Sequence, residues 1–242
     1  MHGSIVWTTG FLTCTRPEGR LCAFLAPFLR FHRDQRGGSM YLVLLIGSAL
    51  VAATTATQAD PVKVGVYDEA FCPACRNFAE TQLGPTYEEL KDIMVVHLNA
   101  YGWAQDWPEG EGYIFDCQHG PDECDGNQIL GCADKYITDP DLLVEFFTCF
   151  MSQDYSVYRP WEDGEKCAGQ LSLDWETIKT CATSVEGQII HHEAGVEFRA
   201  LDPQPVGVPH ITINDVADDY AYTDLKKAVC KAYTGEKPPA CN

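Results

Sequence analysis

The sequence contains few basic residues for its length. Among 242 residues, 17 are Lys or Arg and 35 are Asp or Glu, which gives a formal net charge of -18. The first 59 residues hold five of the basic residues but only two of the acids, so the remainder is more acidic still. Nucleic acids and anionic membranes bind cationic patches, so the charge argues against both as partners, and we expect no nucleic acid to bind. No internal repeat is present, which argues against a repeat array.

A hydrophobic segment long enough to span a membrane comfortably is also lacking. The main apolar run, Tyr41–Val51, follows Met40 and is shorter than the roughly 20 residues that a transmembrane helix needs. With the small residues after it, it is typical of a signal peptide at residues 40–59. We interpret residues 1–39 as a leader or an upstream mis-start, with a signal anchor as the alternative. The mature domain is expected at residues 60–242, with no stable membrane association after cleavage.

Cysteine, in contrast, is abundant: the chain has twelve, and ten of them lie after residue 60. Two of the ten form a CxxC pair, and the other eight are an even number that fits four structural disulfides in an oxidising compartment. Eight cysteines allow 105 pairings, so the sequence does not assign the partners. The structural candidates are Cys117, Cys124, Cys132, Cys149, Cys167, Cys181, Cys230 and Cys241.

The CxxC pair is Cys72-Pro-Ala-Cys75, which lies between an expected strand at Val62–Tyr67 and a helical run towards Leu90. This order is typical of thioredoxin-like proteins. A helix N-terminus stabilises a thiolate, so Cys72 is predicted to be the nucleophile and Cys75 the thiol that resolves the mixed disulfide. A structural bridge and a zinc half-site are the alternatives. No second CxxC or matching histidine pair follows at ligand spacing, so we expect no metal and no bound cofactor, with an external thiol as electron donor.

The rest of the chain supplies the other elements of such a fold. A second strand is expected at Ile93–Asn99, and Gly84-Pro85 is expected to interrupt the helix before it. Residues of about 113–198 hold most of the remaining cysteines and several helical patterns. Strands at Ile211–Ile213 and Tyr220–Tyr222 and a terminal helix follow. The sequence therefore predicts an α/β fold, with a thioredoxin-like core and a disulfide-rich helical insertion.

Val208-Pro209 comes directly before the third expected core strand. Thioredoxin-like proteins keep a cis peptide bond at this place, close to the CxxC. We therefore predict a cis bond here, although a trans proline that begins an ordinary strand is the alternative. Val208 and Pro209 are the expected substrate-binding residues, because the Val208 backbone would pair with a client strand beside Cys72.

Two other groups of polar residues have plainer interpretations. His191-His192-Glu193 resembles part of a zinc-protease motif, but Val196 stands where a second histidine is needed, so a helical surface or core packing is expected. Asp106, Glu109 and Glu111 lie in a Gly-rich acidic segment and are expected to be solvated loop acids.

The block from Cys117 to Cys132 reads CQHGPDECDGNQILGC. It resembles, position for position, the CQHGxxECxxNxxxxC signature of gamma-interferon-inducible lysosomal thiol reductases, and Tyr101–Gln105 is similar to that family's YGNAQ. The resemblance implies a soluble enzyme of endosomes and lysosomes that reduces disulfide-bonded protein substrates at acid pH and, in vertebrates, assists antigen processing. Within the block, Gln118, His119, Glu123 and Asn127 are expected to shape the fold or cover the redox site.

The sequence departs from the family pattern in having no N-glycosylation sequon. Family members commonly reach lysosomes through their glycans, so secretion is an alternative destination. Two rival functions also follow from the sequence. One is a disulfide oxidase or isomerase of the secretory pathway on the same fold, and the other is a non-catalytic, disulfide-rich secreted binding protein.

Overall fold

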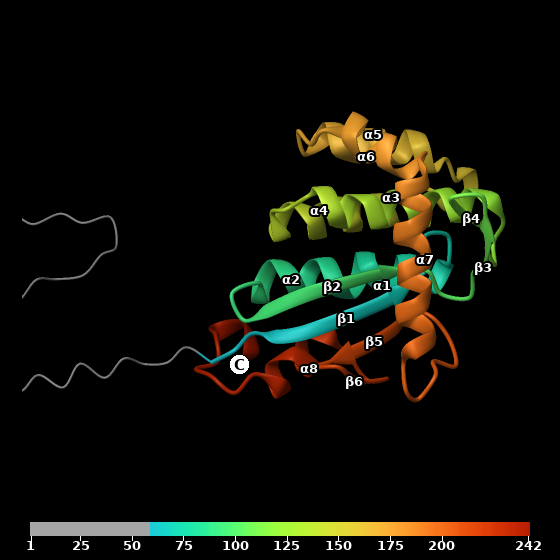
Figure 1. The fold of residues 1–242 in the computed structure, drawn as a ribbon. Helices are drawn as coiled ribbons and strands as arrows, with labels where there is room; N and C mark the ends of the chain where they lie inside the picture. The colour runs from blue at the N-terminus through green and yellow to red at the C-terminus, as the bar shows by residue number, and fades with distance from the viewer. Residues whose placement is uncertain (1–58) are drawn as a thin grey trace, which may run out of the picture. The chain divides into compact units, whose positions relative to one another are not determined.

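A computed structural model describes residues 59–242, and its centre is a four-stranded sheet in the order β2-β1-β5-β6 (Figure 1). The strands are β1 (Val62–Asp68), β2 (Met94–Ala100), β5 (His210–Ile213) and β6 (Val216–Ala217). β1 runs parallel to β2 and antiparallel to β5. The predictions for residues 1–58 lie outside the described residues. Within the described part, no helix is long and apolar enough to cross a membrane.

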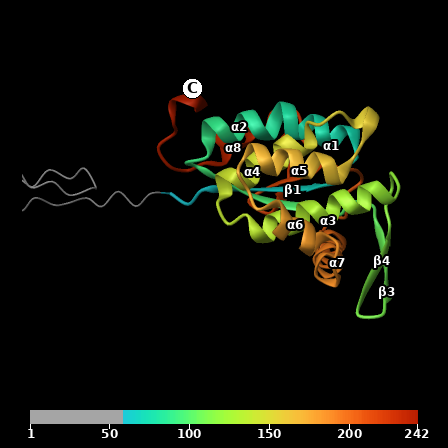
Figure 2. The same ribbon diagram turned by 90° about the horizontal axis from the view of Figure 1, so that it is seen from above.

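Helices cover both faces of this sheet. α1 (Pro73–Phe78), α2 (Gly84–Leu90) and α8 (Leu225–Ala232) lie on one side of β1, and α7 (Val185–Ala200) crosses the other side (Figures 1 and 2). β1 is a central strand with helices on both faces, and Val62, Val64 and Val66 are almost fully buried. The parallel β1-α-β2 unit places the N-terminus of α1 at the carboxyl end of β1.

A π-helical turn, Ala79–Leu83, joins α1 to α2. The Gly84 N–H bonds the Ala79 carbonyl, five residues back, and the α-helix then resumes with Pro85 in its first turn. Proline has no N–H to give to the preceding turn, and a wider turn accommodates that loss. The interruption expected at Gly84-Pro85 therefore takes the form of a π-helical segment within an otherwise continuous helical run.

The region between the two halves of the sheet is helical over most of its length. It contains α3 (Pro121–Tyr136), α4 (Pro140–Met151), α5 (Pro160–Gln170) and α6 (Trp175–Ala182), followed by α7. Helices α3 and α4 pack against β2, and α5 and α6 form a further layer beyond them (Figure 1).

Within residues 59–242, the eight cysteines outside the CxxC all form disulfides. The sequence does not determine how they pair. The structure shows the bridges Cys117–Cys124, Cys132–Cys181, Cys149–Cys167 and Cys230–Cys241. Two of the bridges connect helices of the insertion, α3 to α6 and α4 to α5, and one fixes the C-terminal segment to α8. A helical layer with a small core of its own gains stability from such links.

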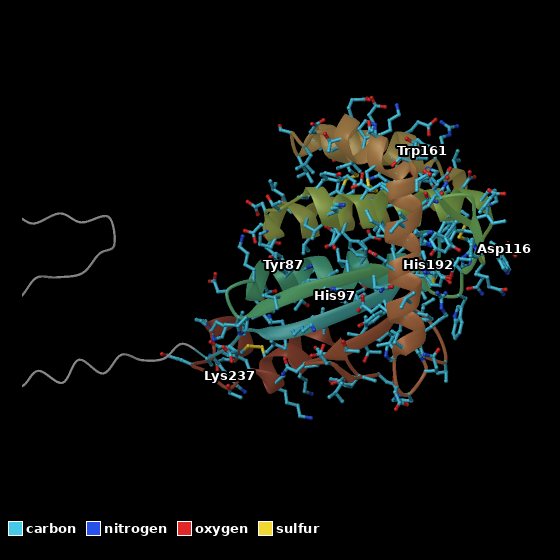
Figure 3. All side chains as sticks on the ribbon, in the orientation of Figure 1. Tyr87, His97, Asp116, Trp161, His192 and Lys237 are labelled. Atoms are coloured by element: carbon cyan, nitrogen blue, oxygen red, sulfur yellow. A yellow bond between two sulfur atoms is a disulfide. The ribbon has the colours of Figure 1, made fainter. Side chains whose placement is uncertain are left out.

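The acidic Gly-rich segment is a β-hairpin and not a solvated loop. Its strands are β3 (Gln105–Glu109) and β4 (Gly112–Asp116). The prediction is wrong for Asp106, whose side chain is 6% exposed and lies 2.5 Å from His192 Nδ1 and 2.7 Å from Arg199 Nη1. His192 lies where α7 meets the hairpin (Figure 3), and its ring stacks on Tyr113. Glu109 and Glu111 are exposed, as expected.

The returning strand also differs from the prediction. Val216–Ala217 pairs with β5, whereas Tyr220–Tyr222 forms a turn before α8. Asn214 and Asp215 both have positive φ and make a tight reversal, so the chain returns sooner than the tyrosines suggested.

Candidate active site

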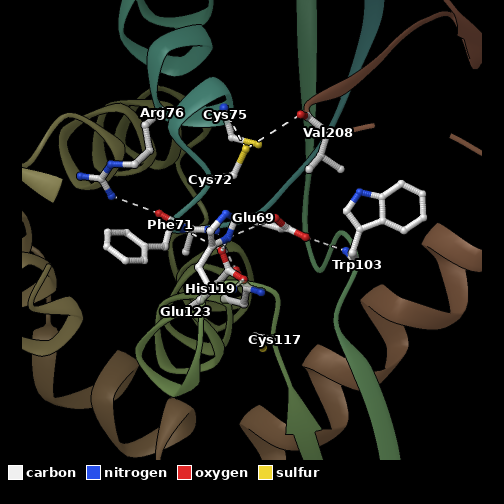
Figure 4. Close-up of polar contacts among 12 residues, drawn as sticks. Glu69, Phe71, Cys72, Cys75, Arg76, Trp103, Cys117, His119, Glu123 and Val208 are labelled. Atoms are coloured by element: carbon white, nitrogen blue, oxygen red, sulfur yellow. Dashed lines mark hydrogen bonds and ion pairs between the residues drawn. The ribbon is translucent and has the colours of Figure 1, made fainter. Parts of the chain in front are cut away.

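Cys72 lies at the N-terminus of α1, directly after the short loop that follows the carboxyl end of β1 (Figure 4). Its backbone is extended and its Sγ accepts the Cys75 N–H at 3.4 Å, as an N-cap side chain does. The same Sγ lies 3.9 Å from the Val208 carbonyl oxygen, and the Val208–Pro209 bond is cis. The structure thus brings together the two cysteines and the two residues predicted to bind substrate.

The pKa values of the two thiols are shifted in opposite directions. A hydrogen bond from the Cys75 thiol is the main cause that lowers the pKa of Cys72, to about 6. Burial opposes this shift. The backbone amides of Cys75 and Ala74 and the positive charge of His119 lower the pKa further. Burial raises the pKa of Cys75, and the Cys72 charge raises it further. Cys72 is the acidic thiol of the pair, and Cys75, 1% exposed, holds its proton.

Two acids precede the CxxC, and both are buried. Burial raises the pKa of Glu69 to about 7 and that of Asp68 well above its ordinary value. Glu69 Oε1 accepts the Trp103 N–H at 2.7 Å, whereas neither Asp68 oxygen has a hydrogen-bond partner among the described residues. Burial keeps both acids protonated in an acidic medium, so there they do not oppose the Cys72 thiolate as ionised acids would.

Residues of the signature block hold the loop that carries Cys72. Asn127 Oδ1 accepts the Ala70 N–H at 2.9 Å, and Glu123 Oε2 accepts the Phe71 N–H at 3.3 Å. Both acceptors are on α3, more than fifty residues away in sequence. On the other side of the loop, buried Arg76 donates from Nη1 to the Ala70 carbonyl at 3.0 Å.

His119, Glu69 and Glu123 form a compact cluster below Cys72 (Figure 4), with one potential ligand atom from each within 4.8 Å of the others. His119 Nδ1 lies 2.6 Å from Glu123 Oε2 and 3.6 Å from Glu69 Oε2. Glu123 Oε1 also accepts the His119 N–H at 3.0 Å. His119 and Glu123 are hydrogen-bonded to each other, whereas Glu69 Oε2 has no hydrogen-bond partner among the described residues. The absence of a metal stays a prediction.

A hollow of about 350 Å³ lies beside the cis-proline. Its walls include Ala74 from the CxxC, Val208 and Pro209, the partly exposed ring of Tyr222, and Asp219. The hollow is open to solvent, and the carbonyl oxygen of Val208, one of its walls, lies 3.9 Å from Cys72 Sγ.

Some of the site could not be located from sequence. Asp68 and Glu69 directly precede the CxxC loop, but no sequence pattern indicates that both are buried. The pairing of His119 with Glu69 joins positions fifty residues apart. The one available signal was the spacing of His119 and Glu123, four residues apart at the start of a helix.

Comparison with known proteins identifies the family. Residues 63–171 match the family model described as "Gamma interferon inducible lysosomal thiol reductase (GILT)". A gamma-interferon-inducible lysosomal thiol reductase from Carassius auratus is 39% identical over 189 residues, which are 76% of this chain and 73% of that protein. The chain belongs to the GILT family. GILT-like protein 1 of Drosophila melanogaster is 31% identical, with 83% of this chain and 85% of that protein covered. The predicted family membership is confirmed, and the GILT protein described here is a thiol-disulfide oxidoreductase.

Solved structures support the fold alone. The thiol-disulfide oxidoreductase MdbA from Corynebacterium diphtheriae matches with a TM-score of 0.52 at 16% identity, covering 74% of this chain and 86% of MdbA. BdbD from Bacillus subtilis matches with a TM-score of 0.51 at 16% identity, covering 73% and 89% of the two chains. The predicted thioredoxin-like α/β fold of this GILT protein is confirmed.

Proposed function

We propose that this GILT family member reduces disulfide bonds of client proteins in an acidic compartment, with Cys72 as the nucleophile. The observation that carries the proposal is the asymmetry of the CxxC. With a pKa of about 6, about a tenth of Cys72 is ionised to the thiolate at pH 5. For an ordinary thiol with a pKa near 8.5, the ionised fraction at pH 5 is less than about one in a thousand. That difference makes reduction in acid feasible.

The reaction uses both cysteines in sequence. The Cys72 thiolate attacks one sulfur of the client disulfide, forming a mixed disulfide, and the other client sulfur leaves and takes a proton from solvent. Cys75 then loses its proton and attacks Cys72 Sγ, which releases the second client thiol. Two electrons have passed to the client, and the Cys72–Cys75 disulfide remains. An external thiol returns the enzyme to its reduced form.

The client would bind across the hollow beside Val208 and Pro209. The Val208 carbonyl faces the same side as Cys72 Sγ, at 3.9 Å from it, and is a hydrogen-bond acceptor for an extended chain. Clients are therefore proteins with accessible disulfides in extended segments. Endosomes and lysosomes fit the acid-tolerant thiol, and the extracellular space is the second destination.

The experiment compares wild type with Cys72→Ser in the reduction of a denatured, disulfide-bonded protein such as lysozyme. Assays at pH 4.5 and pH 7 use a small thiol as electron donor. Wild type is expected to work at both values, and the variant is expected to lose activity to the level of the small thiol alone. Undiminished activity of Cys72→Ser would eliminate the proposed nucleophile.

One observation favours a second candidate, a disulfide oxidase. A stabilised Cys72 thiolate also stabilises the reduced enzyme, which raises the reduction potential of the CxxC. Equilibration of the pair with glutathione buffers measures that potential. A value as oxidising as about -120 mV favours the oxidase, and a value near that of thioredoxin, about -270 mV, favours the reductase.

A further inference from the structure

His119 is placed to act on the redox site although it lies far from Cys72 in sequence. It stands just before α3, with its side chain 30% exposed, and its ring packs edge-on against Phe71 at 6.1 Å between centroids. Phe71 directly precedes Cys72. The ring is held by Glu123 Oε2 at 2.6 Å and faces Glu69 Oε2 at 3.6 Å.

Most other titratable groups around Cys72 are acids. Asp68 and Glu69 come from the end of β1, and Glu123 comes from α3; all three are buried. Arg76, on α1, directs its guanidinium to the carbonyls of Ala70 and Gln153. Cys75 is protonated, and Tyr158, which stacks on Phe71, is neutral because burial raises its pKa.

This arrangement makes the charge state of the cluster dependent on acidity. The positive charge of His119 favours the Cys72 thiolate. Burial raises the pKa of Glu69 to about 7, so that Glu69 is neutral in acid and negative above neutrality. In acid the positive charge of His119 therefore acts on Cys72 without an opposing charge on Glu69.

We propose that His119, held between Glu123 and Glu69, is the positioning residue that supplies positive charge for the Cys72 thiolate in acid, while protonated Glu69 removes the opposing negative charge. The inference rests on the proposed role of Cys72 as nucleophile. No proton passes from His119 to the client. The imidazolium acts by its charge, and Glu123 fixes where that charge lies.

The test measures the rate at which iodoacetamide alkylates Cys72 in the reduced full chain between pH 4 and pH 9, with the modified peptide identified by mass spectrometry. His119→Gln is expected to move the midpoint of the rate against pH, which reports ionisation of the Cys72 thiol, upward by about one pH unit. Such a shift corresponds to an approximately tenfold slower alkylation at pH 5. The limiting rate at high pH is expected to stay within about twofold of wild type, since a local change of charge leaves access to the thiol unchanged.

Three further variants separate charge from structure. His97→Gln is the matched control, because His97 also pairs with a glutamate, Glu197, at 2.7 Å, but lies on β2 (Figure 3). It is expected to leave the midpoint unchanged. His119→Lys keeps a cation at every pH and is expected to restore rapid alkylation at pH 5. Glu69→Gln resembles protonated Glu69, keeps an acceptor for Trp103, and is expected to retain the wild-type rate at pH 5.

A wild-type midpoint in His119→Gln overturns the inference, as does a Glu69→Gln alkylation rate at pH 5 that differs from that of wild type. If His119→Gln does not fold, as judged by circular dichroism, the Glu69→Gln profile decides. Failure of the proposed function has a different signature. In that case Cys72→Ser remains active, whatever the alkylation profiles show.

Discussion

The side-chain oxygen of Asn127 accepts the backbone N–H of Ala70 at 2.9 Å, across 57 residues of sequence. Both residues are buried. The bond joins α3 of the helical insertion to the loop that carries Cys72. The insertion, through a residue of the signature block, therefore holds the loop that carries Cys72.

Removing this contact should weaken both folding and catalysis. Asn127→Ala leaves the Ala70 N–H buried without a partner, which costs about 1–3 kcal/mol of unfolding free energy. A loop that no longer holds Cys72 in place should also reduce client disulfides about tenfold more slowly, as positioning effects of roughly this size do. Urea unfolding and the reductase assay measure the two effects. Gln128→Ala, at a half-buried neighbour on the same helix, is the control, and equal activity of the two variants would contradict the assignment.

Removing the resolving thiol should trap the client. Cys75→Ser retains the Cys72 nucleophile but cannot displace the product, so a mixed disulfide accumulates. Non-reducing gel electrophoresis should show a covalent enzyme–client species that disappears on addition of excess thiol. The Cys72→Ser, Cys75→Ser double variant is the control. A trapped species in that control would show that another cysteine reacts.

Buried His191 should make the fold less stable in acid. Its ring lies between Phe115 and Tyr101, and neither ring nitrogen has a hydrogen-bond partner among the described residues. Burial lowers the pKa of His191 to about 3 from 6.5, so the stability that its neutral form contributes is complete above pH 6.5 and is lost as the pH falls towards 3. At pH 5 the loss is about 2 kcal/mol.

His191→Phe should therefore reduce the difference in unfolding free energy between pH 7.5 and pH 5 by about 2 kcal/mol. Any packing cost of the larger ring is the same at both pH values and cancels. His97→Gln provides a contrast of opposite sign. The hydrogen bond that His97 donates to Glu197 raises the pKa of His97, so its contribution is present in acid and is lost as the pH rises. An unchanged pH dependence in His191→Phe would mean that His191 is not buried as a neutral ring.

The disulfides should differ in their contribution to stability. Cys132–Cys181 closes a loop with a sequence separation of 49 and joins α3 to α6, whereas Cys230–Cys241 closes one of 11. Chain entropy gives about 4 kcal/mol for the first and about 3 kcal/mol for the second. Replacement of each pair by alanines, followed by urea unfolding, measures both. Greater destabilisation from loss of the C-terminal bridge would contradict the entropic account.

The local elements could be predicted from the sequence because their signals are local. The alternating valines of β1, the CxxC and the proline before β5 lie within a few residues of the structures that they specify. Gly84-Pro85 likewise interrupts the helix in which it lies.

The hairpin at Gln105–Asp116 was missed because its acidic and Gly residues are typical of a loop. Asp106 is buried and forms an ion pair with Arg199, which lies 93 residues later in the sequence. The cluster around His119 depends on long-range contacts in the same way, as does the pairing of the cysteines. Neither periodicity nor composition reports which distant residues will meet.

An enzyme that cleaves disulfides is exposed to attack by other copies of itself. The sulfur-bearing residues of its own bridges are mostly shielded: Cys132 and Cys167 are fully buried, Cys181 is 2% exposed, and Cys117 and Cys124 are below 8%. Thiol–disulfide exchange requires an approach along the S–S bond, and Cys132–Cys181, whose two residues are both buried beneath the helical layer, is shielded from it. Cys149 and Cys241 are only partly buried, so Cys149–Cys167 and Cys230–Cys241 are the bridges more open to reduction.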